Sequence, residues 1–133
     1  MAPKGFSLII SSSARERKHF SSILRYLDWA PACVTSLAGA LQVFTTANMD
    51  LILLSENLRG MGLPTALRVL CDLQPHLPVA LVVPQERLPG FGSLPSNGII
   101  DPWASVDDVR TFLEAVEATL AEPSPHEVVY AGT

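Results

Sequence analysis

The chain has 133 residues, a net charge of −4, an apolar fraction of 48% and a charged fraction of 17%. This composition suits one domain with a sizeable core and excludes a disordered segment, while the negative charge argues against a protein that binds the phosphate backbone of nucleic acids. Cys33 and Cys71 fit neither a metal site nor a disulfide framework, and no apolar run is long enough for a signal peptide or a membrane span, so we expect a soluble, cytoplasmic protein.

The first half of the chain alternates short apolar runs with amphipathic segments. The run over 6–10 predicts a buried strand, and apolar residues at helical spacing predict a helix over 14–29. Ser13 followed three residues later by Glu16 resembles a capping box, in which each side chain accepts from the other residue's backbone N–H. After this helix we expect a strand over 32–36, a helix over 37–46, and a strand over 49–54 that is apolar on both faces.

The second half continues the alternation around one long loop. Pro64 in a first turn predicts a helix over 64–73, and the run over 79–83 predicts a strand. Prolines and glycines crowd residues 84–98, and both are poor residues in a helix interior. The chain then predicts a very short strand over 99–100 and a helix over 105–120, where Ser105 and Asp108 resemble a second capping box.

Strands and helices that alternate in this way predict a parallel sheet with helices on both faces. In such sheets functional side chains lie near the carboxyl ends of the strands. The residues expected at those ends are Ser11, Ser12, Ser55, Val83 and Asp101.

Four stretches in this order match a known pattern. A hydrophobic run ends in Ser11-Ser12, Ala40-Leu41 precedes the segment 50–55, the segment 57–62 reads N-L-R-G-M-G, and a Pro-led apolar run over 78–83 precedes Asp101-Pro102. Over residues 6–120 the chain thereby resembles the receiver domain of bacterial two-component response regulators, the CheY-like family. The resemblance implies a flavodoxin-like α/β fold of five βα units: a three-layer sandwich with a five-stranded parallel sheet of order 2-1-3-4-5. The composition of 84–98 predicts that its fourth helix is shortened or absent.

The departures from this family concern its phosphorylation chemistry. The resemblance implies a phosphate-accepting aspartate at the Ser55 position and an acidic, Mg²⁺-binding pair at the positions of Ser11 and Ser12. It also implies a Thr or Ser at Val83 and a Lys at Asp101, each in contact with the phosphoryl group. At each of these five positions the chain has a different residue from the one that the resemblance implies.

Only Pro102, beside the lysine position, is retained. Serine hydroxyls are neutral and do not replace the carboxylates that Mg²⁺ prefers, and a carboxylate at 101 would repel a phosphate. We therefore expect a pseudo-receiver with no metal, cofactor or catalytic residue. It would act in bacterial signal transduction by protein–protein interaction, without Mg²⁺-dependent aspartate phosphorylation.

Two alternatives stay open at this point. Glu56 would be the carboxylate at the strand end if the register slipped by one residue, which would make the chain a true phospho-receiver with an unusual acceptor. The serines at 11–13 precede a helix and could bind an anion, as in a small-molecule or nucleotide sensor, although an N-cap explains them as well. A flavodoxin-like enzyme is disfavoured because no Gly-rich phosphate loop follows the first strand.

Four residues are candidates for contact with a partner. Arg15 and Lys18 belong to a basic segment that could be a docking patch, although such a segment is more often a solvated helix face, and Trp103 could lie exposed or buried against the sheet. Phe91 in the Gly/Pro-rich loop is the fourth candidate. We expect a protein partner, including a second copy of the chain, and neither nucleic acid nor a membrane. The receiver-like domain is expected over 1–122, followed by a C-terminal tail over 123–133.

Overall fold

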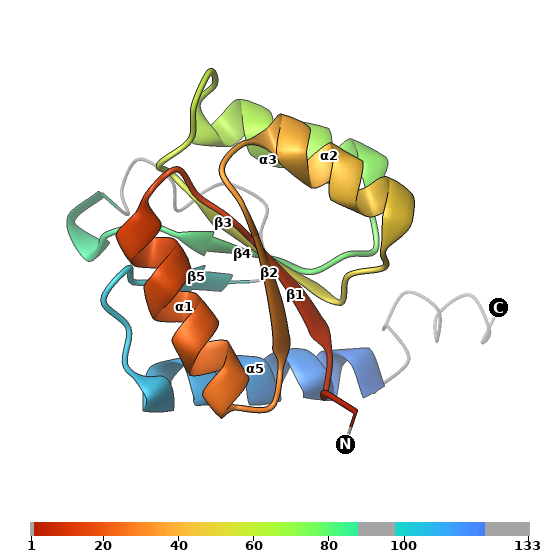
Figure 1. The fold of residues 1–133 in the computed structure, drawn as a ribbon. Coiled ribbons are helices and arrows are strands. Elements are labelled where there is room, and N and C mark those ends of the chain that lie inside the picture. The colour runs from red at the N-terminus through yellow and green to blue at the C-terminus, as the bar shows by residue number, and fades with distance from the viewer. Residues whose placement is uncertain (1, 88–97, 122–133) are drawn as a thin grey trace, which may run out of the picture.

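The computed structural model describes residues 2–87 and 98–121, and strands alternate with helices along this length (Figure 1). The elements are β1 (Phe6–Ile10), α1 (Ala14–Tyr26), β2 (Ala30–Val34), α2 (Leu37–Thr46), β3 (Leu51–Ser55), α3 (Leu63–Leu73), β4 (Val79–Val82), the 3-10 helix η1 (Gln85–Arg87), β5 (Gly98–Ile100) and α5 (Val106–Ala121).

The five strands form one parallel sheet in the order β2-β1-β3-β4-β5. Helices α1 and α5 cover one face of the sheet and α2 and α3 cover the other (Figure 1). The predicted fold class and strand order are therefore confirmed. Between β4 and β5 the described residues hold only η1 where a fourth helix could stand, and residues 88–97 lie outside the described part.

The core consists of two apolar layers, one on each side of the sheet. All five residues of β3 are buried, as expected for a central parallel strand. Phe20 of α1 and Leu113 of α5 pack in the layer on one face, and Leu67 and Leu70 of α3 pack in the layer on the other. Within residues 2–87 and 98–121, no helix combines the length and apolar character needed to cross a bilayer.

The largest boundary differences from the prediction occur between α1 and β2. Helix α1 ends at Tyr26 because Asp28 adopts a left-handed backbone conformation with φ of 67°, which stops the helix three residues early. Strand β2 begins at Ala30, two residues before its predicted start, and includes Pro31. Proline is tolerated there because β2 is an edge strand of the sheet. The other elements match their predicted ranges within two residues at either end.

The two predicted capping boxes differ in outcome. Before α5, Ser105 and Asp108 are reciprocal: the Asp108 N–H donates to Ser105 Oγ at 3.2 Å and the Ser105 N–H donates to Asp108 Oδ2 at 3.3 Å. Before α1, Ser13 accepts from the Glu16 N–H at 3.3 Å, but the Ser13 N–H donates to Ser11 Oγ. The prediction of the first capping box is therefore half wrong. The Ser13 side chain caps the helix, but the Glu16 carboxylate accepts hydrogen bonds from other donors.

Removal of the Ser13 hydroxyl tests the N-cap hydrogen bond from the Glu16 N–H to Ser13 Oγ. Ser13→Ala is expected to lower the free energy of unfolding by about 1 kcal/mol, the usual cost of losing an N-cap. Chemical denaturation with urea measures the change. Ser22→Ala is the matched control, since this exposed serine lies on the same helix and its replacement should leave stability almost unchanged. An equal loss in both variants would contradict the capping role.

Candidate functional site

The carboxyl ends of the strands bring the predicted site residues to one edge of the sheet. Ser11 directly follows β1, Ser55 ends β3 and Val83 follows β4, and all three side chains are buried. Ser12 is half-buried, and Asp101, which follows β5, is exposed. The buried part of this edge thus presents hydroxyl and methyl groups from the strands themselves.

A carboxylate from α1 occupies the space between these strand ends. Glu16 stands in the first turn of α1 and is only 3% exposed. Its Oε1 accepts hydrogen bonds from Ser11 Oγ at 2.7 Å and from Ser55 Oγ at 2.5 Å. Its Oε2 accepts from Asn57 Nδ2 at 2.8 Å. We call these four residues the Glu16 cluster: Ser11, Glu16, Ser55 and Asn57.

The contacts of the two serine hydroxyls determine which hydrogen bonds each one donates and accepts. Ser11 Oγ accepts the backbone N–H of Ser13 at 3.0 Å, and Ser55 Oγ accepts that of Asn57 at 3.0 Å. A hydroxyl has a single proton, so each serine must then donate that proton to the carboxylate. Charge-assisted hydrogen bonds of this kind are roughly twice as strong as neutral ones. Hydrogen bonds to one side chain of α1 therefore connect the loop after β1 to the loop after β3.

The donor set of this edge does not fit Mg²⁺. Mg²⁺ needs several hard oxygen ligands in near-octahedral geometry, usually with carboxylates among them. The hydroxyls of Ser11 and Ser55 are neutral and already accept backbone N–H groups, and both oxygens of the Glu16 carboxylate accept hydrogen bonds. In the described part of the chain, no group of three or more His, Cys, Asp or Glu side chains is placed to hold a metal ion.

The other residues that the sequence singled out at the strand ends are engaged in local contacts. Asp101 Oδ1 accepts the backbone N–H of Trp103 at 2.8 Å, so this carboxylate organises the segment between β5 and α5. The carbonyl of the retained Pro102 accepts from Arg15 Nη1 at 3.3 Å. Glu56 is half-buried and pairs with Arg87 of η1 at 3.1 Å. Any chemistry at Glu56 would therefore have to displace or tolerate this arginine.

Three of the four candidate contact residues come together on the surface. The guanidinium of Arg15 lies 3.6 Å from the ring centre of Trp103, and both residues line a shallow groove with Lys18. Trp103 is 71% exposed, which decides between the two placements that the sequence left open. Phe91 lies outside the described residues.

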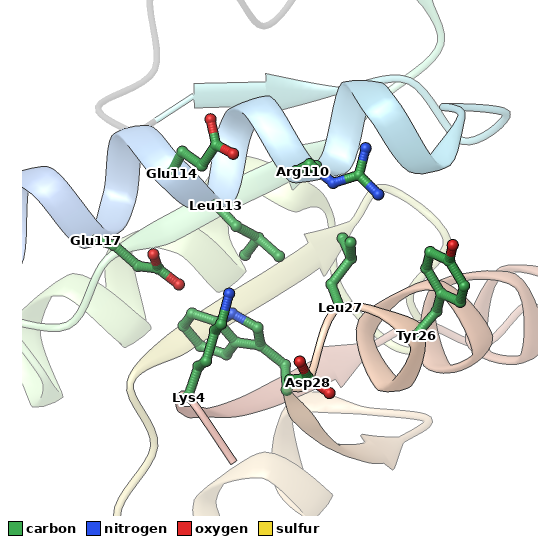
Figure 2. Close-up of a pocket in the computed structure, with 9 residues that line it drawn as sticks. Lys4, Tyr26, Leu27, Asp28, Arg110, Leu113, Glu114 and Glu117 are labelled. Atoms are coloured by element: carbon green, nitrogen blue, oxygen red, sulfur yellow. The ribbon is translucent and has the colours of Figure 1, made fainter.

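A second groove lies at the opposite edge of the sheet, where β1 and β2 begin. Figure 2 shows Arg110, Glu114 and Glu117 of α5 on one side of it and Lys4, Tyr26 and Asp28 on the other. Its volume is about 430 Å³. Both cationic and anionic side chains line this groove, so its charge does not select one class of ligand.

Sequence reasoning missed Glu16 and Asn57 as members of the site. A signal for Glu16 was present, because it precedes Phe20 by four residues and therefore lies on the apolar stripe of α1. A charged residue on a buried helix face requires polar partners, and the strand-end serines supply them. For Asn57 the sequence offers no comparable signal beyond its place just after β3.

Comparisons with known proteins bear on the fold alone. No family model and no curated protein matches the chain. Among solved structures, a signal receiver domain of a histidine kinase from Syntrophus aciditrophicus has a TM-score of 0.76 at 17% identity, over 91% of this chain and 96% of that one. A two-component response regulator from Clostridium difficile has a TM-score of 0.77 at 11% identity, over 90% of this chain and 100% of that one.

A third neighbour is the response regulator TrrA from Thermotoga maritima, solved in complex with Mg²⁺ and BeF. Its TM-score is 0.73 at 12% identity, over 84% of this chain and 97% of that one. The chain therefore has the fold of receiver domains, at sequence identities too low to carry function with it.

Proposed function

We propose that this chain is a pseudo-receiver, which acts in the cytoplasm of a bacterium as a protein-interaction module of signal transduction. It does not accept a phosphoryl group through Mg²⁺-dependent aspartate chemistry. The observation that carries this proposal is the buried Glu16 carboxylate, which lies between the strand ends and accepts hydrogen bonds from Ser11, Ser55 and Asn57.

Electrostatics supports the proposal. Phosphoryl transfer needs cationic groups and a metal ion that offset the negative charge on the phosphoryl oxygens. Here Glu16 places a negative charge between the strand ends, and Asp101 takes the place of the family's lysine. An incoming phosphoryl group would meet a buried anion, because the Ser55 hydroxyl already donates its proton to the Glu16 carboxylate. The fold is retained, and the groups needed for the transfer are absent from these positions.

The two alternatives predict different behaviour at the same edge. A phospho-receiver that uses Glu56 would have to displace or tolerate Arg87, which pairs with this carboxylate at 3.1 Å, and no metal-binding group of carboxylates lies beside it among the described residues. A sensor that binds small anions or nucleotides through the serines at 11–13 would not have the Ser11 hydroxyl free, because it donates to Glu16, and its anion would lie close to that carboxylate. Neither alternative is favoured by a contact in the structure.

Mg²⁺ and beryllofluoride, a mimic of the phosphoryl group, test the proposal directly. Amide resonances of the ¹⁵N-labelled full chain are recorded by NMR with each reagent alone and with both together. We expect no saturable shift at Ser11, Ser55, Glu56 or Val83. The amide of Asp107, an exposed acid on α5, reports non-specific Mg²⁺ binding. Saturable shifts at Ser11 and Ser55 would overturn the proposal, and shifts centred on Glu56 would favour the phospho-receiver.

A further inference from the structure

The surface beside the Glu16 cluster holds a groove between α1 and the segment that joins β5 to α5. Its volume is about 350 Å³. It combines an exposed indole, an aliphatic side chain from the edge of the core and cationic side chains. The lining residues are Arg15, Lys18, His19, Ser22, Ile23 and Trp103.

The exposed indole in this groove is held in place by its neighbours. The Trp103 backbone N–H donates to Asp101 Oδ1, and the Arg15 guanidinium stacks on the ring at 3.6 Å. Arg15 is itself held, since its Nη1 donates to the Pro102 carbonyl at 3.3 Å and its Nη2 lies 3.9 Å from Glu16 Oε2. A large side chain that is both exposed and already ordered loses little conformational entropy when a partner covers it. Trp and Arg are also the residue types most often found at binding hot spots.

The groove belongs to a basic face of an otherwise acidic chain. Helix α1 exposes Arg15, Lys18 and Arg25, and its one acid, Glu16, is buried. Among the described residues, Lys18 has no carboxylate within ion-pairing distance of 4.0 Å.

Three exposed acids lie on the segment from the end of β5 to the first turn of α5, and each has a local partner. Asp101 accepts from the Trp103 N–H, Asp107 pairs with Arg110 at 2.6 Å, and Asp108 caps the start of α5. Within the described part of the chain, Lys18 therefore presents an unpaired cation at the groove, which complements an anionic group on a partner.

We propose that this groove docks an acidic segment of a partner protein. An apolar side chain of that segment would cover Trp103 and Ile23, while its carboxylates would pair with Lys18 and with the outer edge of Arg15. The inference rests on the proposed function, because it names the kind of partner that the interaction module binds. Two other occupants are less consistent with the charges. A two-fold contact of this groove with a second copy would bring Lys18 toward its own counterpart, and the net charge of −4 opposes a nucleic acid.

A peptide display library selected on the full chain tests the proposal, and it does not require the partner to be identified first. Binders are counter-selected against the chain carrying both Lys18→Glu and Trp103→Ala, so that only groove-dependent sequences remain. We expect these sequences to be rich in Asp and Glu around one or two large apolar residues. A recovered peptide should bind at least about tenfold more weakly to either single variant, and more weakly as salt is raised.

Arg25→Glu is the matched control, because Arg25 is an exposed cation of the same helix that does not line the groove. It should leave affinity within about twofold. Neutral or basic binders, or no groove-dependent binder, would overturn the proposal. Concentration-dependent dimerisation that Trp103→Ala abolishes, or single-stranded DNA binding that Lys18→Glu abolishes, would overturn it in favour of those occupants. The pseudo-receiver proposal fails separately, through Mg²⁺ and beryllofluoride shifts at Ser11 and Ser55.

Discussion

Ser55→Asp, which installs an aspartate at the position where the family resemblance implies a phosphate acceptor, is expected to destabilise this chain by roughly 3–5 kcal/mol at pH 7, the range seen when a buried charge is left uncompensated. Ser55 is 2% exposed, and its Oγ lies 2.5 Å from Glu16 Oε1. The substitution removes a donor to Glu16 and places a second carboxylate against the first. Like charges at this separation disfavour the doubly ionised pair.

The pH dependence of this variant has a definite sign. In the folded state the two carboxyl groups would share a proton, whereas in the unfolded chain both ionise near pH 4. The folded state therefore binds more protons between about pH 4 and pH 7, so stability should rise as the pH falls through this window. Urea denaturation at pH 5 and pH 7 measures the difference for the variant and for the wild type.

A second substitution identifies the cause. Glu16→Gln combined with Ser55→Asp leaves one carboxylate in the cluster, and the glutamine amide can donate to it. This double variant should recover at least about 2 kcal/mol relative to Ser55→Asp alone, a coupling expected only for groups in direct contact. Ser55→Asn is the uncharged control for size. A Ser55→Asp variant as stable as the wild type at pH 7 would show that the Glu16 carboxylate does not lie against residue 55.

Glu16→Ala is expected to lower the free energy of unfolding by about 2–3 kcal/mol, because it leaves buried donors without their charged acceptor. Three donors lose their partner: the hydroxyls of Ser11 and Ser55 and the amide of Asn57. The gross loss is larger, but it is offset by removing the cost of burying a carboxylate. Glu16→Gln keeps the shape and an acceptor, so it should cost about 1 kcal/mol.

Hydrogen exchange separates this effect from general destabilisation. Ser13 and Asn57 donate their backbone N–H groups to the two serines that Glu16 orients, so these amides should lose protection before those of β3. Glu114→Ala, at an exposed position on α5, is the matched control and should change neither stability nor exchange. Equal loss of protection across α1 and the sheet would mean that Glu16 does not act through these two loops.

The fold could be predicted from the sequence because its signals are local and repeated. The apolar runs of β1, β3 and β4 and the stripes on α1, α3 and α5 each indicate their element, and alternation fixes the class. The end of α1 could not be placed, since the left-handed conformation of Asp28 depends on tertiary packing that brings Trp29 into the core. Propensity alone does not report such a contact.

The candidate site could be predicted only in part. The sequence places Ser11 and Ser55 at strand ends, because strand polarity determines the edge. It does not show that Glu16 would leave its capping role at Ser13 and turn toward residues that lie up to 41 positions away in the chain. Local rules favour the capping box, whereas the buried hydroxyls of the strand ends offer a stronger set of donors to the same carboxylate. Pairings of this kind are decided by the folded neighbourhood.

The anion at the centre of the Glu16 cluster is part of the polypeptide, which affects how information could pass through the molecule. A negative charge that a kinase adds can be removed again, so it records a recent event. Glu16 is incorporated at synthesis, is present in every copy and lasts until the copy is degraded. Under the proposed function, the output of this domain would therefore vary with its abundance and with competition for its partners, and expression and proteolysis would be the steps at which a cell adjusts it.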